Sequence, residues 1–257
     1  MAELDLIREG HRLLIAGSIG AVQCWVGHPE LLQVTNRATL SWIGEHMSLK
    51  EQMDTLYREL TIDRIPWNLE DPPALLVELV ESQWVFPCEA ADLGCGAGNY
   101  AVWLAAKGFQ MTGVDISPKA VELAEHLARK KGVACRFLVE DLTGDLSKLD
   151  SSFDFAYDWE VLHHIFPKHR RRYVRNVYGL LRPGAGYLSV CFSEHDSDFG
   201  GAEKYRKTPL GTTLYFSSET ELQELFEPLF LIQELCTVEI IGKYGPHTAV
   251  KALMRRR

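Results

Sequence analysis

The stretch Asp92-Leu93-Gly94-Cys95-Gly96-Ala97-Gly98 decides the fold of this chain of 257 residues. It ends a strand that we predict over residues 89–94 and precedes a helix that we predict from Asn99 to about Lys107. Glycine residues allow a tight turn and a close approach of the backbone to a ligand, while the start of a helix offers free N–H donors. The loop therefore predicts a ligand-binding turn between a strand and a helix.

Alternating strand-like and helix-like runs surround this loop. The predicted strands are 89–94, 109–115, 134–140, 153–158, 186–193, about 229–240 and about 247–254, and the predicted helices are about 73–82, 99–107, 118–131, 168–181 and 218–227. This alternation indicates a doubly wound α/β fold, with a mostly parallel sheet of seven strands and helices on both faces. A turn is predicted at Arg182-Pro183-Gly184, and the short connection IGKYGPH predicts an antiparallel hairpin of the last two strands.

The first part of the chain has a different pattern. Residues 1–66 are expected to form a helical extension, because apolar positions recur at helix spacing and Ser48 with Glu51 forms a capping box. Prolines between positions 66 and 73 interrupt this pattern, so residues 67–257 are expected to form the main domain. We expect the extension to act as a lid over the substrate, as active-site lids do.

Acidic residues outnumber basic residues over the whole chain. There are 27 Lys and Arg against 35 Asp and Glu, a formal net charge of −8, so nucleic acid is not expected as a partner. The basic clusters Lys168–Arg172 and Arg255–Arg257 are interpreted as a solvated helix face and a chain end. Six cysteines without metal-ligand spacing argue against a structural metal site and a disulfide framework, and favour a reducing, cytoplasmic location.

An apolar stretch, Leu13–Gly27, could suggest contact with a membrane. It is shorter than the ~20 residues that a spanning helix needs. It contains Gln23 and follows acidic residues that a secretory leader normally lacks. We expect an apolar helix that packs on its own domain, and a membrane-anchored protein is the less favoured alternative.

The residues around the loop distinguish between nucleotide ligands. Asp115 ends the second predicted strand, 23 positions after Asp92, where a carboxylate can accept both hydroxyls of a ribose. Asn99 occupies the place of the third glycine of a dinucleotide fingerprint, and Asp92 would repel a pyrophosphate but suits a cationic amine. The loop also lacks the Lys-Ser/Thr ending of a P-loop. The expected ligand carries a ribose and an amine without phosphates, which disfavours a nicotinamide-dependent oxidoreductase.

Over residues 85–193 the chain resembles the class I S-adenosylmethionine-dependent methyltransferases. AADLGCGAGNY is similar to their first motif, TGVDIS to their acidic second strand end, VEDL to their adenine-binding turn, FDFAYDWEVLHHI to their fourth strand, and LLRPGAGYLSV to the turn before their fifth. The resemblance implies a Rossmann-like methyltransferase fold with S-adenosylmethionine as cofactor. It also implies the following contacts: Asp92, Gly94 and Gly96 at the methionine end, Asp115 at the ribose, Ile116 against the adenine, Asp141 at the adenine amino group, Leu142 beside it, and Asp158 and Trp159 at the methyl group.

Transfer of a methyl group from a sulfonium requires alignment of the acceptor and, for some acceptors, removal of a proton. His163 and His164 follow the fourth predicted strand and are candidate bases, with helix capping and packing as the alternative. Trp67 is a candidate cover for the cofactor or substrate, and otherwise anchors a hinge. Tyr205 and Tyr215, on a long insertion, are candidate acceptor-site residues whose alternative is packing.

The segment PWNLEDPPALLVELVES narrows the expected acceptor. It is similar to the lead-in of the thiopurine and tellurite-resistance branch, which implies a small-molecule acceptor with a sulfur-like, soft nucleophile. The sequence Tyr157-Asp158-Trp159-Glu160 stands where nucleobase and amide N-methyltransferases carry Asn-Pro-Pro-Tyr or Asp-Pro-Pro-Tyr. The alternatives are an O- or N-methyltransferase of a small metabolite and a non-catalytic S-adenosylmethionine-binding regulatory protein. The sequence does not indicate an oligomeric state.

Overall fold

The computed structural model describes residues 6–9, 12–15, 47–147, 149 and 152–257. The α-helices are α2 (Leu49–Glu59), α3 (Ala74–Glu81), α4 (Asn99–Ala106), α5 (Pro118–Lys131), α6 (Pro167–Leu180) and α7 (Glu219–Phe226), and the short 3-10 helices are η2 (Ile62–Arg64), η3 (Leu162–His164) and η4 (Asp198–Gly200). The strands are β1 (Leu6–Glu9), β2 (Arg12–Ile15), β3 (Glu89–Leu93), β4 (Gln110–Asp115), β5 (Cys135–Val139), β6 (Phe153–Trp159), β7 (Leu181–Phe192), β8 (Tyr205–Lys207), β9 (Thr213–Tyr215), β10 (Phe230–Gly242) and β11 (Gly245–Arg256). The predicted doubly wound fold is confirmed, with element ends within a few residues of most expected positions.

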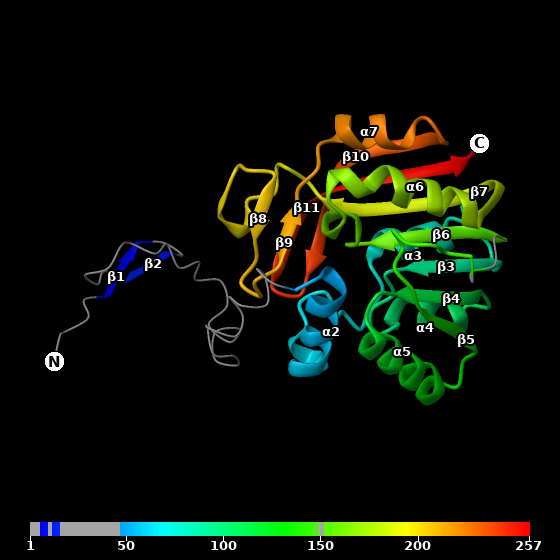
Figure 1. Ribbon diagram of the computed structural model, residues 1–257, viewed down its shortest axis with the longest axis horizontal. Coiled ribbons are helices and arrows are strands. Elements are labelled where there is room, and N and C mark those ends of the chain that lie inside the picture. Colours follow the sequence, from blue (N-terminus) through cyan, green and yellow to red (C-terminus); the bar gives the residue numbers. More distant parts are fainter. Residues whose placement is uncertain (1–5, 10–11, 16–46, 148, 150–151) are drawn as a thin grey trace.

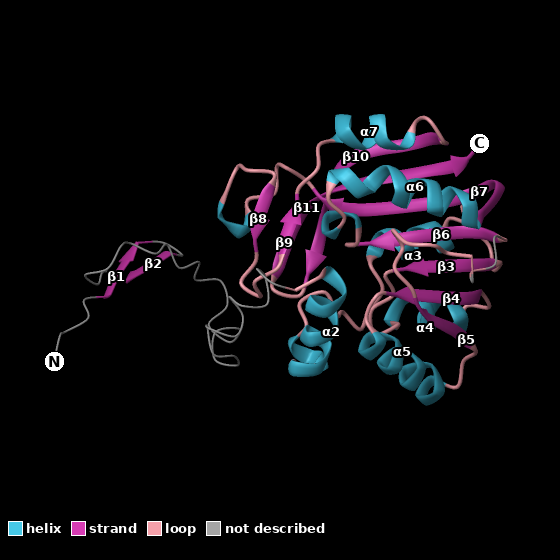
Figure 2. Cartoon of the chain, viewed as in Figure 1, coloured by secondary structure: helices cyan, strands magenta, loops and turns pink. Residues whose placement is uncertain are grey.

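Seven strands form one sheet in the order β10-β11-β7-β6-β3-β4-β5 (Figures 1 and 2). Neighbours from β7 to β5 pair in parallel, whereas β11 is antiparallel to both β7 and β10. The strand order reverses between β3 and β6, and in open α/β sheets a ligand binds outside the carboxyl ends of the strands at such a switch point.

Helices cover both faces of the sheet. Buried residues of α3, α4 and α5 pack with Phe155 and Tyr157 of β6 on one face. Those of α6 and α7 pack with Ala156 of the same strand on the other face. Side chains alternate along a strand, so neighbouring residues of β6 belong to different layers. This alternation decides which residues of β6 can reach a ligand.

The N-terminal extension is only partly helical where the structure describes it. Helix α2 begins at the predicted capping box, since Ser48 accepts from the Glu51 N–H and Glu51 accepts from the Ser48 N–H. Contrary to the helical prediction, β1 and β2 form an antiparallel pair. The two strands are separated in sequence by two residues, one of them glycine, a spacing that favours a hairpin over a helix.

The sequence predicts an apolar helix at Leu13–Gly27, with a membrane anchor as the alternative. The first three residues of this stretch belong to β2, and the others lie outside the described residues. Across the described parts of the chain, no helix combines the length and the apolar character needed to cross a bilayer.

The two remaining differences from the sequence prediction are local. The turn predicted at Arg182-Pro183-Gly184 is an irregularity inside β7, where the pairing with β6 shifts between Phe153 and Phe155. The insertion after β7 contains the short antiparallel pair β8–β9, which the sequence did not predict.

Candidate active site

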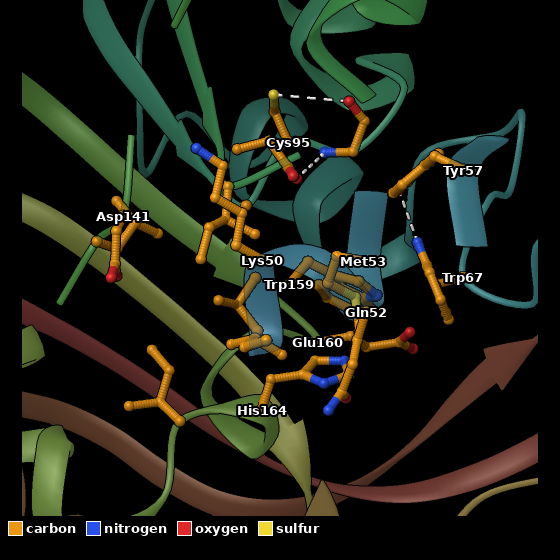
Figure 3. Close-up of a pocket in the computed structure, with 18 of the residues that line it drawn as sticks. Lys50, Gln52, Met53, Tyr57, Trp67, Cys95, Asp141, Trp159, Glu160 and His164 are labelled. Carbon is orange, nitrogen blue, oxygen red and sulfur yellow. Dashed lines mark hydrogen bonds between the residues drawn. The ribbon is translucent and has the colours of Figure 1, made fainter. Parts of the chain in front are cut away.

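A cavity of about 660 Å³ lies at the carboxyl ends of β3, β4, β5 and β6. The glycine loop forms one wall, and α2 with the segment that follows it forms another. Figure 3 shows Cys95 of the loop at one side, Tyr57 and Trp67 at a second, and Asp141 at a third. The switch point of the sheet therefore carries a hollow large enough for small molecules.

The glycine loop is shaped by close approaches that a side chain would prevent. Gly94 has φ of 87°, and a Cβ there would overlap the side chain of Val161, which follows β6. Gly96 has φ of 52°, and its Cβ would lie 2.6 Å from the Tyr57 hydroxyl. The loop thus touches both the segment after β6 and helix α2.

Asp115 anchors the loop from the end of β4. Its Oδ2 accepts the Gly96 N–H at 2.9 Å, and its Oδ1 accepts the Ser117 N–H at 2.8 Å. The side chain is buried but lines the cavity, and burial raises its pKa. Each carboxylate oxygen has a second lone pair, so this group can accept ligand hydroxyls while it holds the backbone.

Asp92 is a buried carboxylate with an unused oxygen. It is 3% exposed and lines the cavity, and its Oδ2 has no hydrogen-bond partner among the described residues. Burial raises its pKa to about 7. A buried unpartnered carboxylate is costly, and a cationic ligand group would compensate for that cost.

The opposite end of the cavity follows β4 and β5. Ile116, Asp141 and Leu142, which were predicted to contact the adenine, line this end of the cavity. The Oδ1 of Asp141 accepts from the N–H and the hydroxyl of Thr143 at 2.8 and 2.7 Å. An apolar side chain and a carboxylate beside each other suit a flat base with an amino group.

Asp158 does not lie at the cavity, in contrast to the expectation that it borders the methyl group. It is fully buried on the α6 side of the sheet and accepts hydrogen bonds from the hydroxyls of Tyr173, Tyr187 and Ser189. Burial raises its pKa to about 6. Because β6 alternates, Trp159 lines the cavity whereas Asp158 turns away from it.

The two histidines after β6 have different positions. His163 is 2% exposed and stacks on Phe192 with ring centroids 4.3 Å apart, so it does not line the cavity. His164 lines the cavity, 6.3 Å from the Trp67 ring. Burial lowers the pKa of His164 to about 4, and that of His163 well below its usual value. Only His164 can meet a substrate directly, and it is neutral at pH 7.

Trp67, the candidate cover for the cofactor or substrate, lines the cavity and is tied to helix α2. Its Nε1 donates to the Tyr57 hydroxyl at 2.7 Å. Nearby, Lys243 of the β10–β11 turn donates to the carbonyls of Ile65 and Asn68 at 3.0 and 3.1 Å. The segment after α2 is therefore held by the far end of the chain.

Tyr205 and Tyr215 are placed together by β8 and β9, but neither lines the cavity. Tyr205 is 51% exposed, whereas the buried Tyr215 donates to Glu221 Oε1 at 2.6 Å and packs under Arg170. From this pair of strands, Thr213 is the residue that reaches the cavity wall. Strand β9 points Tyr215 to the protein interior. The sequence of the insertion has no strand pattern from which this orientation could be predicted.

The comparisons with known proteins agree with this geometry. Residues 90–184 match a protein family described as "Methyltransferase domain". The chain is 27% identical over 152 residues to 2-heptyl-1-hydroxyquinolin-4(1H)-one methyltransferase of Mycobacteroides abscessus, and 28% identical over 137 residues to thiocyanate methyltransferase 1 of Brassica oleracea. A solved SAM-dependent methyltransferase of Methanosarcina mazei superposes with a TM-score of 0.60 at 28% identity, covering 72% of this chain and 98% of that one.

Residues 90–184 thus form the core of a class I S-adenosylmethionine-dependent methyltransferase domain. The two sequence matches cover 57% and 52% of this methyltransferase, and 66% and 60% of the relatives. The chain thus spans less than two thirds of the length of these relatives.

S-adenosylmethionine is the cofactor of this methyltransferase family, and the cavity fits it. The unpartnered Oδ2 of Asp92 suits the amino group of the methionine part, and Asp115 suits the ribose hydroxyls. When bound, the cofactor supplies an electrophilic methyl group on a sulfonium. Because Gly94 and Gly96 lack side chains, the glycine loop can approach Val161 and Tyr57 at the cavity wall without a clash.

Tyr57 and Glu160 are two of the cavity residues that the sequence prediction did not name as site residues. Tyr57 lies on the buried face of α2, which the helix periodicity could have located. Glu160 follows Trp159 and lines the cavity with a positive φ of 61°. Positive φ in a glutamate has no sequence signal, because it depends on surrounding packing.

A charged cluster was also absent from the sequence prediction, which expected no metal ligands. Asp196, Asp198 and His247 place one ligand atom each within 4.8 Å of one another. The His247 Nδ1 lies 3.1 Å from Asp198 Oδ2 and 3.5 Å from Asp196 Oδ2. These carboxylates raise the pKa of His247 against the effect of burial, so the cluster is accounted for as an ion pair.

Proposed function

We propose that this protein transfers the methyl group of S-adenosylmethionine to a small-molecule acceptor whose attacking atom is a sulfur or another soft nucleophile. The observation that carries the proposal is the composition of the cavity beyond the cofactor residues. There the walls are Trp67, Trp159, Phe166 and Met53, which suit a flat, largely apolar molecule. A small acceptor also agrees with the two relatives, whose names give a hydroxyquinolone and thiocyanate as substrates.

The preference for a soft atom rests on the ease with which a thiol loses its proton, since neither histidine predicted as a base is an effective one at neutral pH. His164 has a pKa near 4, so it is a weak base at neutral pH. A thiol loses its proton more readily than an aliphatic alcohol and is the better nucleophile once ionised. The thiocyanate methyltransferase among the relatives supports the same preference.

The residues of the chain would contribute mainly by alignment. Asp92 would hold the amino-acid part of the cofactor and Asp115 its ribose. The methyl group would then point toward the aromatic end of the cavity. Trp67 and Trp159 would orient the acceptor and exclude water. Correct alignment of two reactants can account for much of the rate of such a displacement.

The lid predicted for residues 1–66 stays a proposal. In the described part, Asp54 of α2 accepts from the Ser117 hydroxyl and the Lys119 N–H, both at 2.8 Å, and so caps α5. Met53 and Tyr57 line the cavity. Removing residues 1–60 should therefore lower turnover far more than S-adenosylhomocysteine affinity, and unchanged turnover would contradict a lid.

The experiment that tests the proposed function measures release of S-adenosylhomocysteine from S-adenosylmethionine with two pools of acceptors. One pool holds thiols and selenols, and the other holds amines, phenols and carboxylates. Turnover in the first pool supports the proposal, and turnover confined to the second shows an O- or N-methyltransferase. Silence in both pools with intact binding of S-adenosylhomocysteine would indicate a non-catalytic binder. Asp115→Ala is the control that should lose binding.

A further inference from the structure

Glu160 is held at the cavity in an unfavourable backbone conformation. Its φ of 61° is in the left-handed region, which glutamate rarely adopts. Its N–H donates to the carbonyl of Val190 at 2.8 Å, so pairing between β6 and β7 maintains the conformation. A strained residue at the edge of a site points to a use for its side chain.

The next residue places Glu160 beside the cofactor loop. Val161 packs against Gly94 so closely that a Cβ on the glycine would overlap it. Gly94 belongs to the loop that the cofactor fits, and Trp159 and Glu160 both line the cavity. Figure 3 shows Glu160 and His164 at one end of the cavity and Cys95 of the glycine loop at the other.

The other carboxylates of the cavity are engaged elsewhere. Asp115 holds two backbone N–H groups, Asp141 holds Thr143, and Asp92 fits the cofactor's amine. Glu140 follows β5 beside Asp141, at the opposite end of the cavity, and has an interaction of its own. Among the described residues, no lysine or arginine forms an ion pair with Glu160. This leaves Glu160 as the carboxylate that faces the acceptor.

Three titratable neighbours face Glu160 from other elements. Tyr100 of α4 also lines the cavity, with a buried hydroxyl that lacks a partner among the described residues. His247 of β11 interacts favourably with the Glu160 carboxylate but pairs with Asp198. His164 of η3 is neutral. Burial dominates over these contacts and raises the pKa of Glu160 to about 7, near the optimum for a base at neutral pH.

We propose that Glu160 is a catalytic residue that accepts a hydrogen bond from an acceptor S–H or O–H group and takes its proton as the methyl group moves. The bond from the acceptor atom to the methyl carbon forms while the carbon–sulfonium bond breaks, and that electron pair stays on the cofactor sulfur. The acceptor proton goes to the Glu160 carboxylate and then to water. This inference rests on the proposed function and adds a substrate class: acceptors that arrive protonated and neutral.

The class excludes small anions without a proton. A carboxylate at the acceptor position repels thiocyanate, and no proton remains for it to remove. This methyltransferase should therefore differ from its thiocyanate-named relative in the acceptor that it prefers. The difference gives the experiment its discriminating probe.

The experiment compares the wild-type chain with Glu160→Gln, and with Glu239→Gln as a matched control at an exposed carboxylate of β10. Phenylmethanethiol and 2-naphthol, both protonated at pH 7, and potassium thiocyanate are the probes. For the thiol or the naphthol, wild-type kcat/KM should rise tenfold per pH unit up to about pH 7 and then level off. Glu160→Gln should remove this rise and lower kcat/KM by about 100-fold or more. Its Kd for S-adenosylhomocysteine should stay within about twofold of wild type.

Calorimetry supplies a readout that does not depend on turnover. Binding of 2-naphthol to the complex with S-adenosylhomocysteine is measured in two buffers of different ionisation enthalpy, which reveals proton exchange with Glu160. A tenfold weaker affinity in Glu160→Gln, without a buffer-dependent enthalpy, supports the contact even if no probe is methylated. In that case the proposed function alone fails.

Three results would overturn the inference. The first is a Glu160→Gln variant that keeps the wild-type rate and pH profile. The second is wild-type turnover of thiocyanate faster than that of both protonated probes. The third is absence of any binding of 2-naphthol and phenylmethanethiol to a complex that holds S-adenosylhomocysteine normally.

Discussion

Two buried carboxylates on neighbouring strands have opposite surroundings. Asp158 of β6 is enclosed on the α6 side of the sheet and accepts from three protein hydroxyls. Asp92 of β3 is also buried, but it lines the cavity, and its Oδ2 has no partner among the described residues. The first group is satisfied by the fold, whereas the second would be satisfied by a ligand. The difference separates a residue that holds the structure from one that we propose binds the cofactor.

The largest effect is expected from removing the enclosed carboxylate. Asp158→Ala leaves the hydroxyls of Tyr173, Tyr187 and Ser189 without their acceptor and should lower the free energy of unfolding by about 3 to 5 kcal/mol. Urea unfolding measures this change, and Asp154→Ala, which breaks a half-exposed ion pair with Arg182, should cost less than ~1 kcal/mol. Similar stability of the two variants would show that Asp158 is not a structural group.

The cavity carboxylate should show the reverse behaviour. Asp92→Asn should weaken binding of S-adenosylhomocysteine by about 10- to 100-fold, because an amide lacks the charge that pairs with the amine. Calorimetry with 5′-methylthioadenosine, which lacks the amino-acid part, provides the matched control and should give nearly unchanged affinity. An equal loss for both ligands would place the effect of Asp92 on the shape of the loop instead.

The pH dependence of stability sharpens the same contrast. Burial raises the pKa of Asp92 to about 7 in the folded chain, whereas this pKa is near 4 in the unfolded chain. The free energy of unfolding therefore falls as the pH rises from about 4 to about 7. Relative to wild type, ligand-free Asp92→Asn should therefore gain on the order of 2 kcal/mol between pH 5 and pH 8. Urea unfolding at the two pH values measures the gain, and a constant difference would mean that Asp92 titrates normally.

The smallest effect is expected at the cavity wall, where the hydrogen bond between Trp67 and Tyr57 is only half-buried. Trp67→Phe keeps the aromatic surface but loses the hydrogen bond from Nε1 to the Tyr57 hydroxyl. We expect a loss of about 1 kcal/mol, seen as a three- to tenfold higher KM for the acceptor. Tyr57→Phe removes the same bond from the other side and should match it; unequal effects would show that one ring contacts the substrate by itself.

Much of the fold could be predicted because local patterns coincide with the final structure. The glycine loop, the proline-started helix α5 and the capping box of α2 follow rules that depend on a few neighbouring residues. The failures are of two kinds. Residues 6–15 had an apolar pattern that suits either helix or strand, and β7 includes the turn at Pro183 because its bulge depends on pairing with β6.

The sequence by itself predicted the family, the cofactor and candidate residues at the ends of β3, β4 and β5, since these lie within a few residues of the glycine loop or of a strand end. The tertiary structure alone decided the end of the cavity where we propose that the acceptor binds. There, alternation along β6 turns Asp158 toward α6 and Trp159 toward the cavity, and packing holds Glu160 at positive φ. Helix α2 brings Tyr57 to Gly96 across 39 positions of sequence. Such contacts follow from how distant segments pack, and no local pattern encodes them.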